Sequence, residues 1–205
     1  MQNFNEWKKE FWNYKVIICL SVLFWVIANI LMIIAGSYTE KKGDVAVSDL
    51  ILNAIPTVDL SIIFAYGMTI IILVLILYPF FFNIKELHRV LIHLSLLTLA
   101  RSIFITLTHL KQPSDAIITT LPRIYELIVF RNSLFFSGHV GFSFLGFLLY
   151  REKSKFLKYF FLIATLVMIA TVLLMHVHYS IDVFAALFIT YGVYKIGENL
   201  LRRVN

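Results

Sequence analysis

Long apolar stretches alternate with short polar segments along the chain and divide it into six regions of similar length. Each apolar region has roughly 20 residues, the length that an α-helix needs to cross the hydrocarbon core of a bilayer. The pattern predicts an all-α, polytopic membrane protein with six transmembrane helices in one bundle, and a single integral membrane domain over residues 1–205. The expected spans are residues 15–36, 60–82, 90–110, 134–150, 156–175 and 180–196.

Two of the polar segments carry further expectations. The first 14 residues are polar and aromatic, and they predict an interfacial lead-in to the first span. That span exceeds the roughly 7 to 15 apolar residues of a signal-peptide core, which favours a retained anchor. The connection over residues 111–133 contains two prolines, and we expect a short interfacial helix near residues 125–130.

Composition supports the membrane assignment and excludes several classes of protein. Hydrophobic residues make up 60% of the chain, and the mean hydropathy is +0.85, which is too apolar for a soluble domain. Cys19 is the single cysteine, which rules out an intrachain disulfide. No zinc-type spacing is present, so we expect no metal and no cofactor. The net charge of +6 is assigned to topology signals and lipid contacts rather than to nucleic-acid binding.

The distribution of lysine and arginine predicts the orientation. Of the 18 basic residues, twelve lie on the side of the two termini, five lie on the other side, and Arg101 lies within a span. The positive-inside rule therefore predicts cytoplasmic termini. The short length and the lack of a soluble appendage favour a bacterial inner membrane over a eukaryotic organelle.

The third span carries a polar stripe. Its polar residues recur at three- and four-residue steps, so they lie on one helix face that is expected to line a bundle interior or a wet cavity. His93 in the same span is interpreted as a packing residue, and Arg101 is either functional or a snorkelling cation. The stripe consists of Ser95, Thr98, Arg101, Ser102, Thr106 and His109.

Two histidine segments carry the candidate chemistry. His178 and Asp182 stand four residues apart, so on a helix the carboxylate would accept a hydrogen bond from the imidazole. His139 lies 39 residues before His178, which corresponds to about two spans, so both histidines are expected at the same membrane surface. Ionisable groups inside a bilayer cost roughly 2.5 to 3.5 kcal/mol each on insertion scales, which favours a functional interpretation.

These residue types together suit phosphoryl chemistry on a lipid. Two imidazoles can move protons, while a fixed cation such as Arg101 balances the charge of the transition state. Ser137 and Gly138, near an expected helix start, would add backbone N–H groups directed at a phosphate. His176 is either a further substrate-binding residue or only a neighbour of the pair.

The two histidine segments resemble paired motifs of the sphingomyelin synthase-related family, within the type-2 phosphatidic acid phosphatase superfamily. The resemblance covers about residues 46–190 and includes the segments 49–56 and 99–103. It implies a six-helix enzyme in which His178 is the nucleophile, Asp182 orients it, and His139 acts as acid and then as base. The motifs are Ser137-Gly138-His139 and His178-Tyr179-Ser180-Ile181-Asp182-Val183.

The chain also departs from the patterns of these families. The family's Cys-Gly-Asp is replaced by Arg131-Asn132-Ser133, and Val140 replaces a threonine. The classical lipid phosphatase pattern has an arginine where Val172 stands, and it also contains an Arg-Pro pair that this chain lacks. The resemblance is therefore closer to the synthases than to the phosphatases.

We therefore expect a membrane lipid phosphotransferase with a phosphohistidine intermediate. It would move a phospho-headgroup from a phospholipid donor to a lipid-alcohol acceptor such as ceramide, while Arg101 holds the phosphate. The site would face the periplasm, the exterior or the lumen. One alternative is a lipid phosphatase or phospholipase C, and another is a membrane module that binds headgroups without turnover. Turnover of a labelled lipid and the identity of its product separate the three.

Overall fold

The computed structural model describes residues 4–42, 45–117 and 134–204, and over these ranges every labelled element is helical. This confirms the all-α prediction, while the helix expected near residues 125–130 falls outside the described residues. Three short helical turns accompany the α-helices: η1 (Leu52–Ala54), η2 (Ile63–Gly67) and η3 (Ile84–Glu86). The α-helices are α1 (Phe4–Glu40), α2 (Met68–Phe82), α3 (Leu87–Leu107), α5 (Gly138–Tyr150), α6 (Lys155–Leu174) and α7 (Ser180–Val204).

Five helical segments among the described residues are long and apolar enough to cross a membrane, and α5 is a shorter apolar helix of 13 residues. These segments support a multi-pass integral membrane protein. Their bounds are Phe4–Glu40, Ile63–Phe82, Ile84–Leu107, Lys155–Leu174 and Ser180–Arg202.

Two helix starts differ from the sequence prediction. The first 14 residues, expected as an interfacial lead-in, belong to α1 from Phe4 onward. Trp7 holds this part of the helix in place: its ring stacks on Phe11, and its Nε1 donates to the Phe80 carbonyl 2.7 Å away. The fourth span begins as a helix only at Gly138 and not at residue 134.

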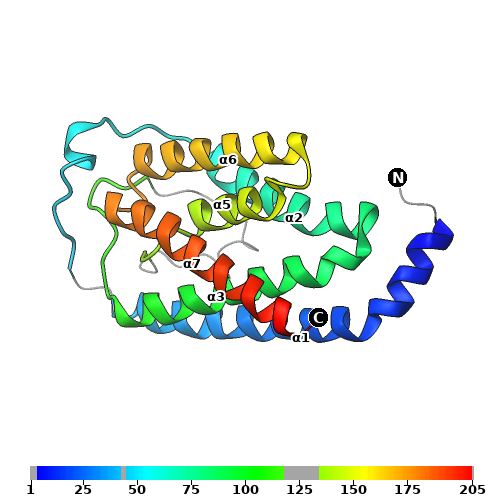
Figure 1. The fold of residues 1–205 in the computed structure, drawn as a ribbon. Helices are drawn as coiled ribbons and strands as arrows, with labels where there is room; N and C mark the ends of the chain where they lie inside the picture. The colour runs from blue at the N-terminus through cyan, green and yellow to red at the C-terminus, as the bar shows by residue number, and fades with distance from the viewer. Residues whose placement is uncertain (1–3, 43–44, 118–133, 205) are drawn as a thin grey trace.

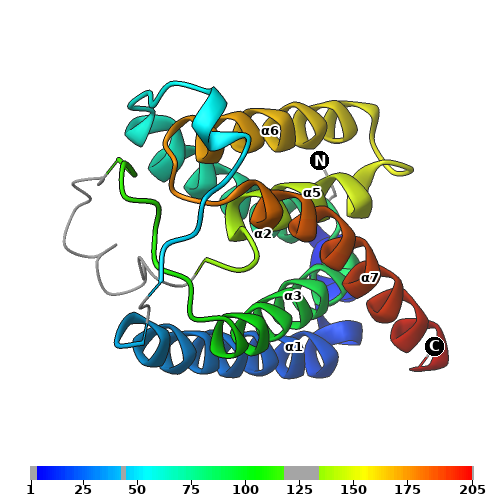
Figure 2. The same ribbon diagram turned by 90° about the vertical axis from the view of Figure 1, so that its left-hand side faces the viewer.

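The helices lie roughly side by side in one bundle. Figure 1 shows α1 running along α3 on one side of the bundle and α6 on the other, with α5 and α7 between them. The start of α1 and the end of α7 lie at the same end of the bundle. Figure 2 looks at the opposite end, where the segments that follow α1 and α3 face the viewer together with the start of α7.

Helix α1 packs on α3 through small residues. Ser21, Ala28 and Ala35 recur every seven residues and are buried, which lets the two backbones approach closely. The Thr39 hydroxyl lies 3.1 Å from the Ile105 carbonyl of α3. Most other apolar side chains of α1 are exposed, as expected for a helix that faces lipid.

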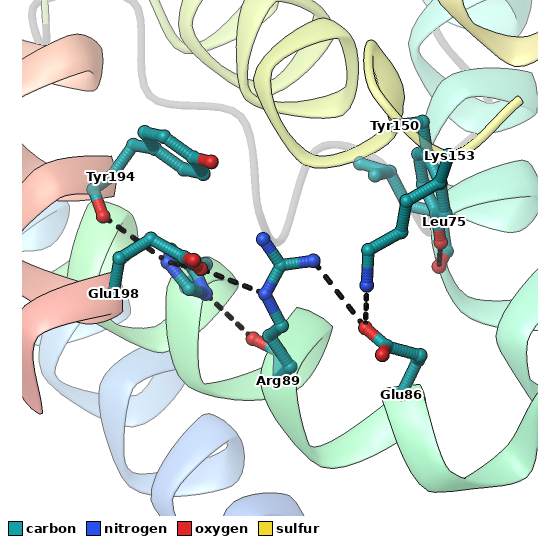
Figure 3. Close-up of polar contacts among 8 residues, drawn as sticks. Leu75, Glu86, Arg89, Tyr150, Lys153, Tyr194 and Glu198 are labelled. Carbon is teal, nitrogen blue, oxygen red and sulfur yellow. Dashed lines mark hydrogen bonds and ion pairs between the residues drawn. The ribbon is translucent and has the colours of Figure 1, made fainter. Parts of the chain in front are cut away.

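A network of ion pairs joins α3, α7 and the α5–α6 turn at the end that holds the termini (Figure 3). Nε of Arg89 donates to Glu198 at 2.7 Å, and its Nη1 lies 3.3 Å from a Glu86 oxygen that also accepts from Lys153. His93 is fully buried against this network, with Nδ1 2.7 Å from the Arg89 carbonyl, which fits a packing residue.

A cavity of about 630 Å³ opens at this same end. Arg89 and Arg101 are about 18 Å apart along α3 at 1.5 Å per residue, so the cavity is separate from the region of the catalytic candidates. Its lining is Tyr14, Lys85, Glu86, His88, Arg89, Glu198, Leu201 and Arg202.

Candidate active site

The N-terminus of α5 forms one wall of the site. Ser137 is the N-cap residue in an extended conformation, and Gly138 and His139 form the first turn of the helix. Serine is a common residue type at this position, but the Ser137 side chain makes no capping hydrogen bond to the helix. The first N–H groups of any α-helix lack partners within the helix, so this end of α5 suits an anion.

His178 and Asp182 lie at the N-terminus of α7, which begins at Ser180. The prediction that both residues lie on one helix is wrong for His178, which precedes α7. The four-residue contact persists, with Nδ1 of His178 3.4 Å from Oδ2 of Asp182. That oxygen also accepts from the Tyr179 N–H at 2.9 Å, so Asp182 caps its own helix. Nε2 of His178 is the ring nitrogen that does not face Asp182.

The two helix starts are joined directly. The Ser137 N–H donates to the backbone carbonyl of Asp182 at 3.2 Å. The side chains of His139 and His178 are close enough to interact electrostatically, and so are those of Arg101 and Asp182. The structure therefore brings the three predicted catalytic residues and the predicted phosphate-binding cation to one place.

Arg101 is fixed by the segment that leads into α5. Its Nε donates to the Phe136 carbonyl at 3.0 Å, and Nη1 lies 3.7 Å from the Met32 sulfur. A Cβ built on Gly138 would stand 3.2 Å from Nε of Arg101. Gly138 thus lets the guanidinium approach the first turn of α5.

The expected polar stripe on α3 is confirmed only in part. Ser95, Thr98 and Ser102 are buried, and Arg101 is partly exposed. Thr106 and His109 are exposed, and His109 follows the end of α3 at Leu107. The buried part of the stripe therefore ends at Ser102.

His139 packs against Phe64, a residue that no sequence motif marks. Its ring stacks on Phe64, with ring centroids 3.9 Å apart and an interplanar angle of 25°. Phe64 belongs to η2, a π-helical turn, and such turns occur often at functional sites. No periodicity in the sequence signals this contact, because a phenylalanine in an apolar span resembles any packing residue.

His176 ends α6 in a Schellman motif. Its N–H donates to the Leu173 carbonyl and the next N–H, of Val177, donates to Val172. This requires the left-handed conformation, and His176 has a φ of 52°. Histidine is an unusual residue for that position, where glycine or asparagine is preferred, and such strain is concentrated at functional sites.

The side chain of His176 pairs with a second missed residue. Its Nδ1 lies 2.7 Å from Oδ2 of Asp115, whose own side chain is 59% exposed. Asp115 sits in a turn closed by the hydrogen bond from Ala116 to the Pro113 carbonyl. Pro-Ser-Asp is a turn signature, but nothing in the sequence pairs this loop carboxylate with His176.

Three buried polar atoms of the predicted site lack hydrogen-bond partners among the described residues. They are Oγ of Ser137, Nε2 of His176 and Oδ1 of Asp182. Buried polar atoms in proteins are nearly always paired, so each of these atoms has capacity for a ligand or water. A pocket of about 110 Å³ adjoins the same region and includes Asp115 and Tyr179 in its lining. No group of three or more metal-binding side chains occurs in the part of the chain that the structure describes.

Comparison with known families agrees with this arrangement. Residues 132–199 match the family model described as PAP2 superfamily C-terminal, and this range contains both histidine motifs. The match supports the type-2 phosphatidic acid phosphatase superfamily and points to lipid phosphatase or phosphotransferase chemistry. No curated protein and no solved structure matches the chain.

Proposed function

We propose that this protein is a membrane lipid phosphotransferase of the sphingomyelin synthase type, which transfers a phospho-headgroup from a glycerophospholipid to a lipid alcohol such as ceramide. The observation that carries the proposal is the meeting of the α5 and α7 N-termini with Arg101, His139 and the His178–Asp182 pair. A helix N-terminus and a guanidinium both favour an anion, and two imidazoles can move protons beside it.

In the first half-reaction, Nε2 of His178 attacks the phosphorus atom of the donor. The P–N bond forms as the P–O bond to diacylglycerol breaks, and His139 gives its proton to the departing oxygen. Asp182 accepts the hydrogen bond from Nδ1–H, which fixes the tautomer that leaves Nε2 nucleophilic and stabilises the charge that develops on the ring. The contact of 3.4 Å is long, as is common for catalytic hydrogen bonds in the absence of substrate.

In the second half-reaction, His139 acts as a base instead of an acid. His139, now neutral, takes the proton of the acceptor hydroxyl as its oxygen attacks the phosphohistidine. The P–N bond breaks and both histidines return to their starting states, so no proton is gained or lost over the cycle.

Four further residues bind the phosphate in this proposal. The hydrogen bond from Nε of Arg101 to Phe136 fixes the guanidinium plane against α5, where it can reach phosphate oxygens. Ser137 supplies Oγ, which has no other partner among the described residues, and Gly138 supplies its backbone N–H at the helix start. His176 offers Nε2, because its Nδ1 is held by Asp115.

A hydrolase remains the second candidate, because the family match names the phosphatase superfamily. The first half-reaction would be the same, and water would replace the lipid alcohol in the second. The same residues would act in both reactions, so substituting them does not separate a transferase from a hydrolase. Only the product of the second half-reaction distinguishes the two.

The test is a product assay with purified protein and a donor labelled in its phospho-headgroup. We expect ceramide to increase headgroup release, with most of the label recovered on ceramide. His178→Ala and Asp182→Asn should nearly abolish label release with and without acceptor. Free phospho-headgroup or phosphate that is indifferent to every lipid alcohol would establish the hydrolase, and donor binding without turnover would leave only the binding module.

A further inference from the structure

Asp49 lies in the segment that follows α1 and is hydrogen-bonded on both sides. Its Oδ1 accepts from the N–H groups of Ile51 and Leu52, at 2.9 and 3.1 Å, and so holds its own loop. Its Oδ2 accepts from the N–H of Ser180 at 2.7 Å. Ser180 is the first residue of α7, so a carboxylate from 131 positions earlier caps the helix that carries Asp182.

The N-terminus of α7 therefore has two carboxylates with separate partners. Asp49 takes the Ser180 N–H, and Asp182 takes the Tyr179 N–H while it faces His178. If Asp49 were removed, the Ser180 N–H would lose its acceptor. The carboxylate of Asp182 lies only two residues later on the same helix and is the available replacement, but it would have to turn away from His178 to reach that N–H.

We propose that Asp49 is a positioning residue for the His178–Asp182 pair: by capping Ser180 it keeps the Asp182 carboxylate directed at the His178 imidazole. This rests on the function proposed above. Asp49 does not touch the reacting atoms, and its effect passes through the backbone of α7.

Neighbouring contacts hold the same segments together. The Tyr179 hydroxyl donates to the Lys111 carbonyl at 2.8 Å and accepts from the Val47 N–H at 3.1 Å. The Val58 N–H donates to the Leu174 carbonyl at 2.8 Å. The segment that contains Asp49 is thus tied to the chain on both sides of His178, which makes it a rigid support for the cap.

The decisive variants are Asp49→Ala and Asp49→Asn, with Asp59→Asn as the matched control. Asp59 also accepts hydrogen bonds within its own loop, from Ser61, but among the described residues it makes no hydrogen bond or ion pair with α7, and it is exposed. Alanine removes both sets of hydrogen bonds. Asparagine has one acceptor oxygen, so it can retain the loop contacts or the Ser180 contact but not both.

We expect kcat to fall at least about tenfold in Asp49→Ala and about threefold in Asp49→Asn, with KM for the donor within about twofold of wild type. Asp59→Asn should match wild type. A second readout does not need turnover: the Nδ1 proton resonance of His178 in detergent micelles, assigned by its loss in His178→Ala. We expect it to shift in Asp49→Ala, to shift less in Asp49→Asn, and to stay unchanged in Asp59→Asn.

Each outcome decides the proposal. Wild-type kcat and an unmoved resonance in folded Asp49→Ala would overturn it. The proposal would also fail if Asp49→Ala, Asp49→Asn and the control Asp59→Asn all showed the same rise in KM and the same fall in kcat. If Asp49→Ala does not fold, the comparison of Asp49→Asn with Asp59→Asn decides by the same two readouts. If the wild-type protein turns over no lipid, the proposed function fails, while the resonance still tests the positioning role.

Discussion

Nδ1 of His176 lies 2.7 Å from Oδ2 of Asp115, which is closer than His178 lies to Asp182 at 3.4 Å. The chain thus contains two imidazole–carboxylate pairs whose histidines lie two residues apart. The first anchors the end of α6 to the loop after α3, and the second lies at the start of α7. Because Nε2 of His176 is buried without a partner among the described residues, the first pair has a ring nitrogen available for substrate.

Substitution of His176 should separate its backbone role from its side-chain role. Glycine and asparagine both accept the φ of 52°, so His176→Gly and His176→Asn should preserve the Schellman motif and leave the protein folded. Turnover should fall at least about tenfold, because Nε2 is lost. Thermal unfolding and turnover of the same preparations provide the measurement.

His109→Asn is the control for this experiment, since His109 is an exposed histidine at the same end of the bundle. It should leave turnover unchanged. Full activity in His176→Gly would return His176 to a purely structural role.

Gly138→Ala tests the close approach of Arg101 to α5. The new methyl group would stand 3.2 Å from Nε of Arg101 and must push the guanidinium away. We expect turnover to fall by about tenfold, or roughly 1.4 kcal/mol in the activation free energy, with the fold retained. Gly192→Ala is the matched control, because a Cβ there meets no atom within 4 Å. It should keep activity and leave stability equal or higher.

The sequence predicted the parts of this site that depend on helix geometry. The six-region pattern and the 39 residues between His139 and His178 placed both histidines at one end, where the structure has them. The exact helix starts were missed because apolar periodicity continues through residues 134–137, although Ser137 is an N-cap residue type.

The contacts made by loops could not be predicted in the same way. Asp49 reaches α7 across 131 positions, and Asp115 reaches His176 across 61. A carboxylate in a polar loop looks the same in the sequence whether it faces solvent or caps a distant helix. Phe64 was missed for a related reason, since one aromatic residue among many apolar ones has no distinguishing pattern.

Arg101→Lys should not behave as a conservative change. Lysine keeps the charge but loses the planar fork that can bond a carbonyl and phosphate oxygens together. We expect at least about a tenfold fall in turnover, with folding retained. Wild-type turnover in this variant would show that Arg101 is a structural or snorkelling cation.

Asp49 should also affect stability at low pH. Burial acts to raise the pKa of its carboxyl, but the hydrogen bonds from Ser180, Leu52 and Ile51 outweigh it and lower the pKa below the ordinary value. A lowered pKa in the folded state means that the stabilisation is present above about pH 4 and is lost as pH falls through the folded pKa. The melting temperature of Asp49→Asn should therefore decline less between neutral and acidic pH than that of wild type. An identical decline would show that the Asp49 contacts contribute nothing to stability.

The orientation of the bundle is the last prediction, and it follows from the basic residues together with the arrangement of the helices. The start of α1 and the end of α7 lie at one end, and the histidine motifs lie near the other (Figure 1). Because twelve basic residues gather on the side of the termini, we propose that this end is cytoplasmic and that the site faces outward. Single cysteines in a Cys19→Ser background can test this, since Ser114 is exposed near the site and Glu152 is exposed in the α5–α6 turn. In intact cells, an impermeant maleimide should label Ser114→Cys directly and Glu152→Cys only after permeabilisation. The reverse pattern would place the site in the cytoplasm and would require a donor lipid from the inner leaflet.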